Sequence, residues 1–411
     1  MNSRRREFLK QSLAASTLTA LGDLVVPGFL AQSARAIESA KSSAAAAGRK
    51  LVVIQLIGGN DGLNTVVPHR HDGYLRARRA LRIPSGQVQK ITDEIGLHPG
   101  MGQLAKLAED RRVSILQGVG YPNPDRSHFR SMEIWETARV ETGALESGWL
   151  GRTVDHTKQD GGDIPALHLG RQTLPLALKS PKTQIPSIEN IEQYRLQTDD
   201  AKLKATLRDT IAANRGPQDP LLSFVQRTTL AAYRSSDRLE EVAKHKSKLN
   251  NSPFGLARRL GQIAQLIKAG FQTPIYYTSL EGFDTHANQL GAHAGLLTEL
   301  SDSVAEFHRE LAESKLADQV AIVAFSEFGR RVSENASAGT DHGAAAPVFV
   351  VGPVKTPGLI GEHPRFDRLD DGDLIHHTDF RRVYASLLQE WLQCPAEPVL
   401  GSGFQPMGLF A

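Results

Sequence analysis

Five short polar segments of this sequence combine carboxylates, imidazoles, glycines and a hydroxyl in spacings that suit metal and ester chemistry. They are residues 58–62 (Gly-Gly-Asn-Asp-Gly), 123–128 (Asn-Pro-Asp-Arg-Ser-His), 282–286 (Gly-Phe-Asp-Thr-His), 326–330 (Ser-Glu-Phe-Gly-Arg) and 340–343 (Thr-Asp-His-Gly). The first four come after apolar runs, and the last precedes one. Because ligands of an open parallel sheet bind at the carboxyl ends of its strands, we expect these segments to meet at one edge.

The candidate metal ligands are all oxygen or nitrogen donors. The chain has a single cysteine, Cys394, which excludes an intramolecular disulfide and a thiolate metal cluster. Carboxylate and imidazole sets suit zinc or manganese, and two ions would suit phosphoryl transfer. We expect one or two divalent ions, most readily zinc, with manganese or calcium as alternatives. The predicted ligands are Asp61, Asp284, His286, Glu327, Asp341 and His342, with His293, His376 and His377 as weaker candidates.

Two of these segments also have plain structural interpretations. Gly-Asn-Asp-Gly, which contains Asp61, is equally typical of a turn without a ligand. Asp284 and His286 are two residues apart, which suits one metal ion, yet loop polarity alone explains them too. Glu327 follows a buried apolar run, so its charge requires a partner.

Ser127 stands at the start of a predicted helix. As an active residue it would be a nucleophile at a helix N-terminus that attracts anions, with Arg126 or Arg130 clamping an anionic ester. The alternative is a plain N-cap, in which the Ser127 side chain accepts a hydrogen bond from the amide of Arg130.

The apolar periodicity predicts an α/β fold with a mostly parallel sheet and helices on both faces. Residues 171–250 are poor in strands, polar and charged, and are interpreted as a helical insertion in a single domain that spans 50–411. The expected strands are 51–57, 112–119, 165–170, 274–280, 320–325 and 347–352. The expected helices are 101–110, 127–139, 201–215, 220–247, 254–269, 288–313 and 378–392.

The first 36 residues are typical of an export signal. Arg5-Arg6 precedes Glu-Phe-Leu-Lys, a broken apolar stretch follows, and Ala34-Arg35-Ala36 is a cleavage site, so residues 1–36 are predicted to be a twin-arginine signal peptide. A low-complexity tether at 37–49 follows. We expect a periplasmic or secreted protein that engages the twin-arginine translocon and keeps no membrane span. The leader holds five of the 48 basic and two of the 45 acidic side chains, so the mature chain is neutral and gives no reason to expect nucleic acid.

These motifs, in this order from Leu51 to the C-terminus, resemble a bacterial exported family, that of domain of unknown function 1501. That family in turn resembles, more distantly, the alkaline phosphatase and sulfatase superfamily. The resemblance implies Ser127 as nucleophile and metal contacts from Asp61, Asp284, His286 and His342. It also implies that 377–380 open the last helix.

One departure from the superfamily concerns Glu327 and Phe328, which stand where Asp-His is usual. Glu327 can replace the aspartate, whereas Phe328 cannot ligate. Either Asp341 or a histidine elsewhere compensates, or one metal site is altered or missing. Two functions follow from the sequence. One is a metal-dependent hydrolase of phosphate or sulfate esters, on a small-molecule or polysaccharide substrate. The other is a non-catalytic envelope protein of the same fold that binds a polysaccharide or a protein.

Overall fold

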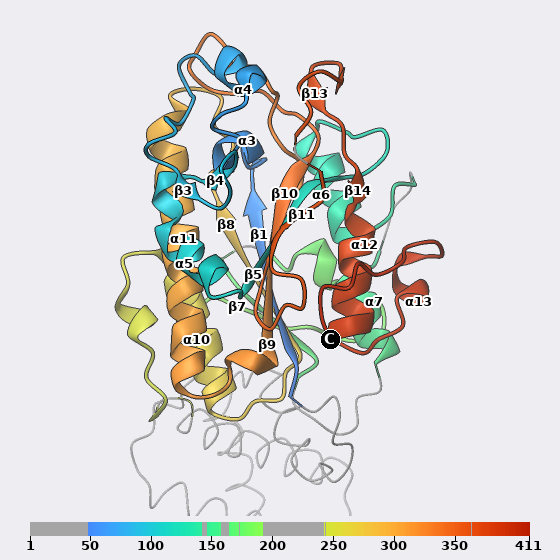
Figure 1. Cartoon of the computed structure of the whole chain (residues 1–411). Coiled ribbons are helices and arrows are strands. Elements are labelled where there is room, and N and C mark those ends of the chain that lie inside the picture. Colours follow the sequence, from blue (N-terminus) through green and yellow to red (C-terminus); the bar gives the residue numbers. More distant parts are fainter. Residues whose placement is uncertain are drawn as a thin grey trace, which may run out of the picture.

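A nine-stranded sheet forms the centre of the computed structural model, which describes residues 48–141, 146–157, 164–171, 173–191, 242, 244–362 and 364–411 (Figure 1). The strand order is β11 (Gly358–Ile360), β5 (Val113–Gly120), β10 (Ala346–Val351), β9 (Val320–Ser326), β1 (Lys50–Ile57), β8 (Ile275–Glu281), β6 (Ala166–Leu169) and β7 (Ser187–Ile188), and β14 (Thr378–Asp379) also pairs with β5. Only β10 runs antiparallel to its neighbours. The predicted α/β class with a mostly parallel sheet is confirmed.

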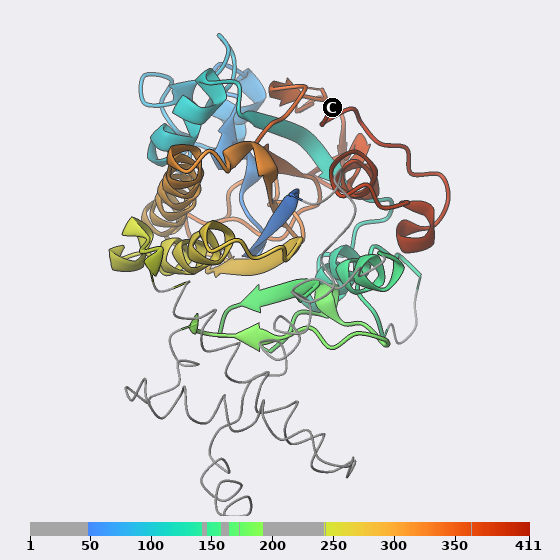
Figure 2. The ribbon, with the colours of Figure 1, turned by 90° about the horizontal axis from the view of Figure 1, so that it is seen from below.

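Helices cover both faces of the sheet, and the alternation of side chains along β1 shows how. Val52, Ile54 and Leu56 belong to one apolar core, whereas Leu51 and Val53 belong to the other. This alternation follows from the two-residue period of a strand. The first core is closed by α5 (Gly102–Glu109), α10 (Gly255–Lys268) and α11 (Gln289–Glu313), and the second by α6 (His128–Thr137), α7 (Trp149–His156), α12 (Phe380–Ala385) and α13 (Glu397–Leu400) (Figure 2).

All six expected strands are present, with ends shifted by no more than two residues. The last expected helix is divided, because α12 passes into a π-helical turn, η6 (Ser386–Trp391). Residues 1–47 and 192–241 lie outside the described residues, and with them the signal peptide and most of the predicted helical insertion. The described parts of that insertion include the short 3-10 helices η2 (Leu176–Leu178) and η4 (Lys248–Asn251). Across the described ranges, no helix combines the length and apolarity that a membrane span requires.

Smaller elements surround the carboxyl ends of the parallel strands, at the upper end of Figure 1. Leu63, Val67, Tyr74 and Val332 form a small apolar cluster of their own there. These loop-borne elements build the rim on which the polar segments lie. They are α3 (Gly62–Thr65), β2 (Val66–Val67), α4 (Asp72–Ala77), β3 (Gln89–Lys90), β4 (Gly96–Leu97), η1 (Pro99–Met101), β12 (Leu369–Asp370) and β13 (Asp373–Leu374). A further short helix, η5 (Ala317–Gln319), lies at the other end of the sheet, where it precedes β9.

Candidate metal centre

Three histidines from separate loops converge on one carboxylate oxygen of Asp284. The Nε2 atoms of His286, His342 and His128 lie 3.0, 3.2 and 3.4 Å from Asp284 Oδ1. Ligand atoms of His128, Asp284 and His342, one from each residue, lie within 4.8 Å of one another. His286 Nε2 contacts two of these residues, Asp284 and His342. We refer to these four residues as the histidine centre.

The sheet brings these residues together. His128 opens α6 after β5, and Asp284 and His286 follow β8. His342 precedes β10, and because β10 is antiparallel, its start lies beside the ends of the parallel strands. A main-chain bridge between Arg330 and His342 fixes that loop. The predicted convergence at one sheet edge therefore holds for these positions.

Each imidazole of the histidine centre has an acceptor at Nδ1. His128 Nδ1 lies 2.8 Å from Glu327 Oε1, His286 Nδ1 lies 3.2 Å from Asp341 Oδ1, and His342 Nδ1 lies 2.7 Å from a main-chain carbonyl oxygen. An acceptor there requires the ring to carry its proton on Nδ1. The Nε2 lone pairs are then free to face inward, as in a metal site whose ligands are oriented by outer partners.

The inward-facing nitrogens lie closer than neutral imidazoles tolerate without a cation or a shared proton. His286 Nε2 and His342 Nε2 are 2.9 Å apart. With both Nδ1 atoms protonated, neither Nε2 has a hydrogen to donate. His128 Nε2 is buried and makes no hydrogen bond within the described residues, although it lies 3.4 Å from Asp284 Oδ1. The donor set, three imidazoles and one carboxylate, is one that zinc commonly takes.

Arg330 holds Asp284 in place and was not identified from the sequence. Its Nη2 donates to Asp284 Oδ1 at 2.7 Å, and its side chain is fully buried. Burial by itself raises the pKa of Asp284, but the hydrogen bond and the positive charge of Arg330 help to outweigh it, and the pKa is lowered to about 2. Asp284 is therefore a carboxylate throughout the physiological range. Arg330 also donates to the carbonyl oxygens of Gly58, Gly59, Phe283 and Thr340.

Glu327 and Asp341, both predicted as ligands, lie behind histidines. Glu327 is completely buried, and its Oε1 accepts from the amide of Gly58 at 2.9 Å as well as from His128. Asp341 Oδ1 accepts from Asn335 at 3.2 Å in addition to His286. In this arrangement the two carboxylates orient imidazoles, and the charge of Glu327 has the partner that its burial demands.

Replacing Glu327 with Gln is expected to weaken metal binding about 10- to 100-fold, the usual effect of losing an outer carboxylate behind a histidine ligand. The amide oxygen still accepts from Gly58 and His128, so the fold should persist. Competition with a chelator measures the zinc affinity. Glu334→Gln is the matched control, because the Glu334 side chain accepts only from the amides of Ala80 and Leu81 in the part of the chain that the structure describes. Equal zinc affinity of Glu327→Gln and the wild type would contradict the orienting role.

Phe328 fills the space beside the imidazoles. Its ring centroid lies 4.8 Å from those of both His128 and His342. Gly59 makes room for it, since a Cβ on Gly59, whose φ is +75°, would lie 2.3 Å from the Phe328 ring. Phe328 has no ligand atom, and its ring packs against the imidazoles of His128 and His342 instead.

Asp61 lies apart from the histidine centre in a buried ion pair. Arg78 donates to both carboxylate oxygens, at 2.6 and 3.0 Å, and Gln289 adds a third hydrogen bond. Neither side chain of the pair is exposed. Burial raises the pKa of Asp61, but the charge and hydrogen bonds of Arg78 outweigh this and lower it. The structure thus directs Asp61 toward Arg78, a partner 17 residues along the chain that the sequence pattern did not reveal.

Both chain neighbours of Ser127 belong to the histidine centre or contact it. His128 is one of its four residues, and the carbonyl oxygen of Arg126 contacts His342 Nδ1. It is the N-cap residue of α6, yet its side chain makes no capping hydrogen bond, and it is exposed. The specific bond to the amide of Arg130 that a plain cap would make is absent. The hydroxyl of Ser127 is therefore exposed to solvent, next to His128 in the chain.

The two arginines predicted to clamp an ester are already engaged. The guanidinium of Arg126 donates to Asp371 at 2.8 Å and to Asp373 at 2.6 Å. Arg130 donates to Glu133 at 2.5 Å and to two main-chain carbonyl oxygens after α6. Each guanidinium therefore holds neighbouring parts of the chain, and it would have to share or break these hydrogen bonds to clamp an ester.

The weaker histidine candidates lie elsewhere. His293 is buried on α11, its Nε2 lies 2.9 Å from Asn60 Oδ1, and burial lowers its pKa to about 4. It is therefore a neutral core histidine. His376 and His377 line a separate pocket. His128 is not among the ligands predicted from the sequence, although it follows a strand end as His286 does.

Comparison with known proteins gives a family but no activity. The family model described as "Protein of unknown function (DUF1501)" matches residues 48–388, and no curated protein matches the chain. Similar solved structures include the lipoteichoic acid synthase LtaP from Listeria monocytogenes, at 10% identity over 80% of this chain and 73% of that chain with a TM-score of 0.36.

A second similar structure is the PsFucS1 sulfatase from Pseudoalteromonas sp., at 12% identity over 80% of this chain and 67% of that chain with a TM-score of 0.35. A third is the alkaline phosphatase from the Antarctic bacterium TAB5, at 10% identity over 74% of this chain and 91% of that chain with a TM-score of 0.30. Identities and TM-scores this low transfer neither activity nor residue roles.

Proposed function

This chain belongs to the DUF1501 family of proteins of unknown function, whose description assigns no activity. From the histidine centre, we propose that the protein is a metal-dependent hydrolase of phosphate or sulfate esters. The observation that carries it is the orientation of three imidazoles by Nδ1 acceptors, so that their Nε2 atoms meet Asp284 Oδ1. That arrangement favours one divalent ion, because Asp61 is paired with Arg78 and offers no second site.

A divalent ion in the histidine centre would neutralise ester oxygens and lower the pKa of an attacking hydroxyl or water. The chain's own groups complete the site. Ser127 offers an exposed hydroxyl without a capping bond, and Arg330 balances the charge of Asp284 from the buried side. The side chains of Asp284 and His286 are 49% and 44% exposed, so a substrate can reach the centre from solvent.

Ser127→Ala tests whether the hydroxyl attacks the ester. If Ser127 is the nucleophile, the variant should lose most hydrolysis of an aryl phosphate, phosphodiester or sulfate, because no other group takes over its covalent step. Its melting temperature should stay near that of the wild type, because no capping bond is lost.

Ser333→Ala is the matched control for Ser127→Ala, since Ser333 is also exposed in a loop after a site segment. It should hydrolyse the same substrates at the wild-type rate. Hydrolysis that survives in Ser127→Ala would discard serine attack and leave a water molecule as the nucleophile.

A second candidate function is a non-catalytic binding protein of the envelope. It is favoured by the engagement of Arg126 and Arg130 in internal ion pairs, which leaves the ester without the expected clamp. Metal-loaded protein that hydrolyses none of the three ester classes, while binding a polysaccharide or protein, would select this function over the first.

We propose further that the protein is exported by the twin-arginine route, from Arg5-Arg6 and the Ala34-Arg35-Ala36 site. Changing Arg5 and Arg6 together to Lys should leave the precursor in the cytoplasm, because the translocon reads the arginine pair. Fractionation with immunodetection measures this, and mass spectrometry should find Ile37 at the mature N-terminus. Normal export of the double variant would remove the assignment.

A further inference from the structure

A cavity separate from the histidine centre lies beside β10, lined on one side by residues 362, 364–365, 368 and 374–377. It encloses about 410 Å³, within the usual range for small-ligand sites. None of the residues of the histidine centre lines it. Leu63, Val66, Pro347 and Leu374 give it apolar walls. The cavity therefore stands as a site of its own, whatever the chemistry of the centre.

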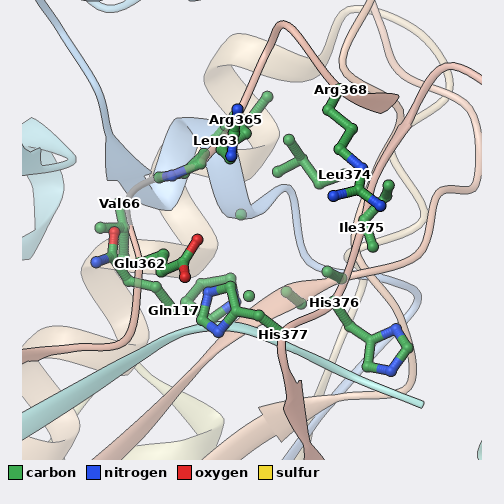
Figure 3. Close-up of a pocket in the computed structure, with 16 residues that line it drawn as sticks. Leu63, Val66, Gln117, Glu362, Arg365, Arg368, Leu374, Ile375, His376 and His377 are labelled. Carbon is green, nitrogen blue, oxygen red and sulfur yellow. The ribbon is translucent and has the colours of Figure 1, made fainter. Parts of the chain in front are cut away.

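Unpaired polar groups of opposite kinds face each other across this cavity. Arg368 stands on one side, reaching over Leu374, and Glu362 lies on the other beside His377 (Figure 3). Within the described residues, neither Arg368 nor Glu362 has an ion-pair or hydrogen-bond partner, although the other arginine of the lining, Arg365, is paired with Asp367. A ligand that satisfies both sides must bring an anion for Arg368 and hydrogen-bond donors for Glu362.

Gln117 supplies a further unmet acceptor. Its side chain lines the cavity, the residue is only 5% exposed, and its Oε1 has no hydrogen-bond partner. A buried amide oxygen without a donor is costly, and a ligand hydroxyl is the kind of group that would relieve it. Gln117 needs a donor, and the carboxylate of Glu362, which is exposed, can accept from a second one, so a ligand with several hydroxyl groups fits this side of the cavity.

His377 is fixed at the base of the cavity by close packing. A Cβ on Gly118 or on Gly361, both at positive φ, would lie within 2.6 Å of its ring. Its main-chain amide donates to Gly118 O at 3.0 Å, and its Nδ1 lies 3.1 Å from the hydroxyl of Thr378. The ring is thus held in one orientation before any ligand arrives, which reduces the ordering cost of binding.

We propose that this cavity binds a sugar unit that carries an anionic substituent, a carboxylate, sulfate or phosphate. The apolar walls suit the C–H face of a sugar ring, Arg368 takes the anion, and Glu362, Gln117 and His377 take the hydroxyl groups. The proposal does not depend on hydrolysis or on a metal ion in the histidine centre.

Titration calorimetry on the metal-loaded wild type tests the proposal. The probes are glucuronate, glucose 6-sulfate and glucose 6-phosphate, with neutral glucose and inorganic sulfate as references. At least one anionic sugar should bind about tenfold or more tighter than both references, the ratio that one charge-assisted hydrogen bond supplies. The proposal is overturned if inorganic sulfate binds as tightly as the best anionic sugar, or if no sugar binds with a Kd below about 10 mM.

Two variants locate the binding. Arg368→Gln should abolish the preference for the anionic sugar over glucose, whereas Arg76→Gln, a change at an exposed arginine outside the cavity, should preserve it. A preference that persists in Arg368→Gln overturns the assignment. Unchanged sugar binding by His342→Ala would support a site separate from the histidine centre, and its loss would contradict that separation.

Discussion

Asp284→Asn should lose its metal and, with it, most of the hydrolytic activity. Among the described residues, Asp284 is the one carboxylate whose oxygen faces the Nε2 atoms of all three histidines, so the substitution removes the negative group on which they converge. The amide keeps the volume of the side chain and an oxygen for the hydrogen bond from Arg330. The fold should therefore remain, apart from the stability that metal binding itself adds. Elemental analysis of purified protein measures the metal content.

Asp341→Asn is the control for that substitution, because Asp341 contacts the ring of His286 from behind. It should keep most of its metal, with an affinity reduced by about 10- to 100-fold at most. If Asp284→Asn kept a full complement of metal and the wild-type rate, the ion would have to be held by other residues.

Arg78→Met should destabilise the protein by about 3–5 kcal/mol, the usual cost of leaving a buried charge without its partner. Asp61 would keep only Gln289 as a side-chain donor from outside its own loop. The double variant Asp61→Asn, Arg78→Met should regain much of this loss, because it removes the stranded charge as well. Denaturant unfolding at pH 7 measures the difference.

The pH dependence of Arg78→Met gives a second readout. In the wild type the pKa of Asp61 lies below its ordinary value. The ion pair therefore stabilises the fold at pH values above the pKa that Asp61 has in the unfolded chain, and this stabilisation is lost as the pH falls toward the lowered pKa. Without Arg78 the burial of Asp61 raises its pKa, and protonation relieves the strain. The deficit of the variant should therefore shrink as pH falls. A deficit below about 1 kcal/mol at pH 7 would show that Asp61 gains another partner.

Much of the architecture could be predicted because it follows from short-range periodicity. The strand Lys50–Ile57 is apolar from Leu51 onward except at Gln55, as expected for a strand covered on both faces. The direction of Ala346–Val351 could not be predicted, since an apolar run does not reveal whether its neighbours are parallel. That direction matters for the site, because it brings His342 to the edge from the start of a strand.

The site was only partly predictable for a different reason. Asp284, His286 and His342 lie in loops next to strands, so position along the chain was enough to find them. Long-range pairings decided the other roles. Arg126 meets Asp373 from 247 residues away, and no local pattern contains that contact.

The position of a bound metal ion tests the histidine centre most directly. Crystals of the wild type grown with zinc should show one anomalous scattering peak at the zinc edge. The peak should lie about 2.0–2.2 Å from the Nε2 atoms of His128, His286 and His342 and from a carboxylate oxygen of Asp284. A zinc-loaded crystal without a peak among these residues, or with its peak at Asp61, would contradict the assignment of this site.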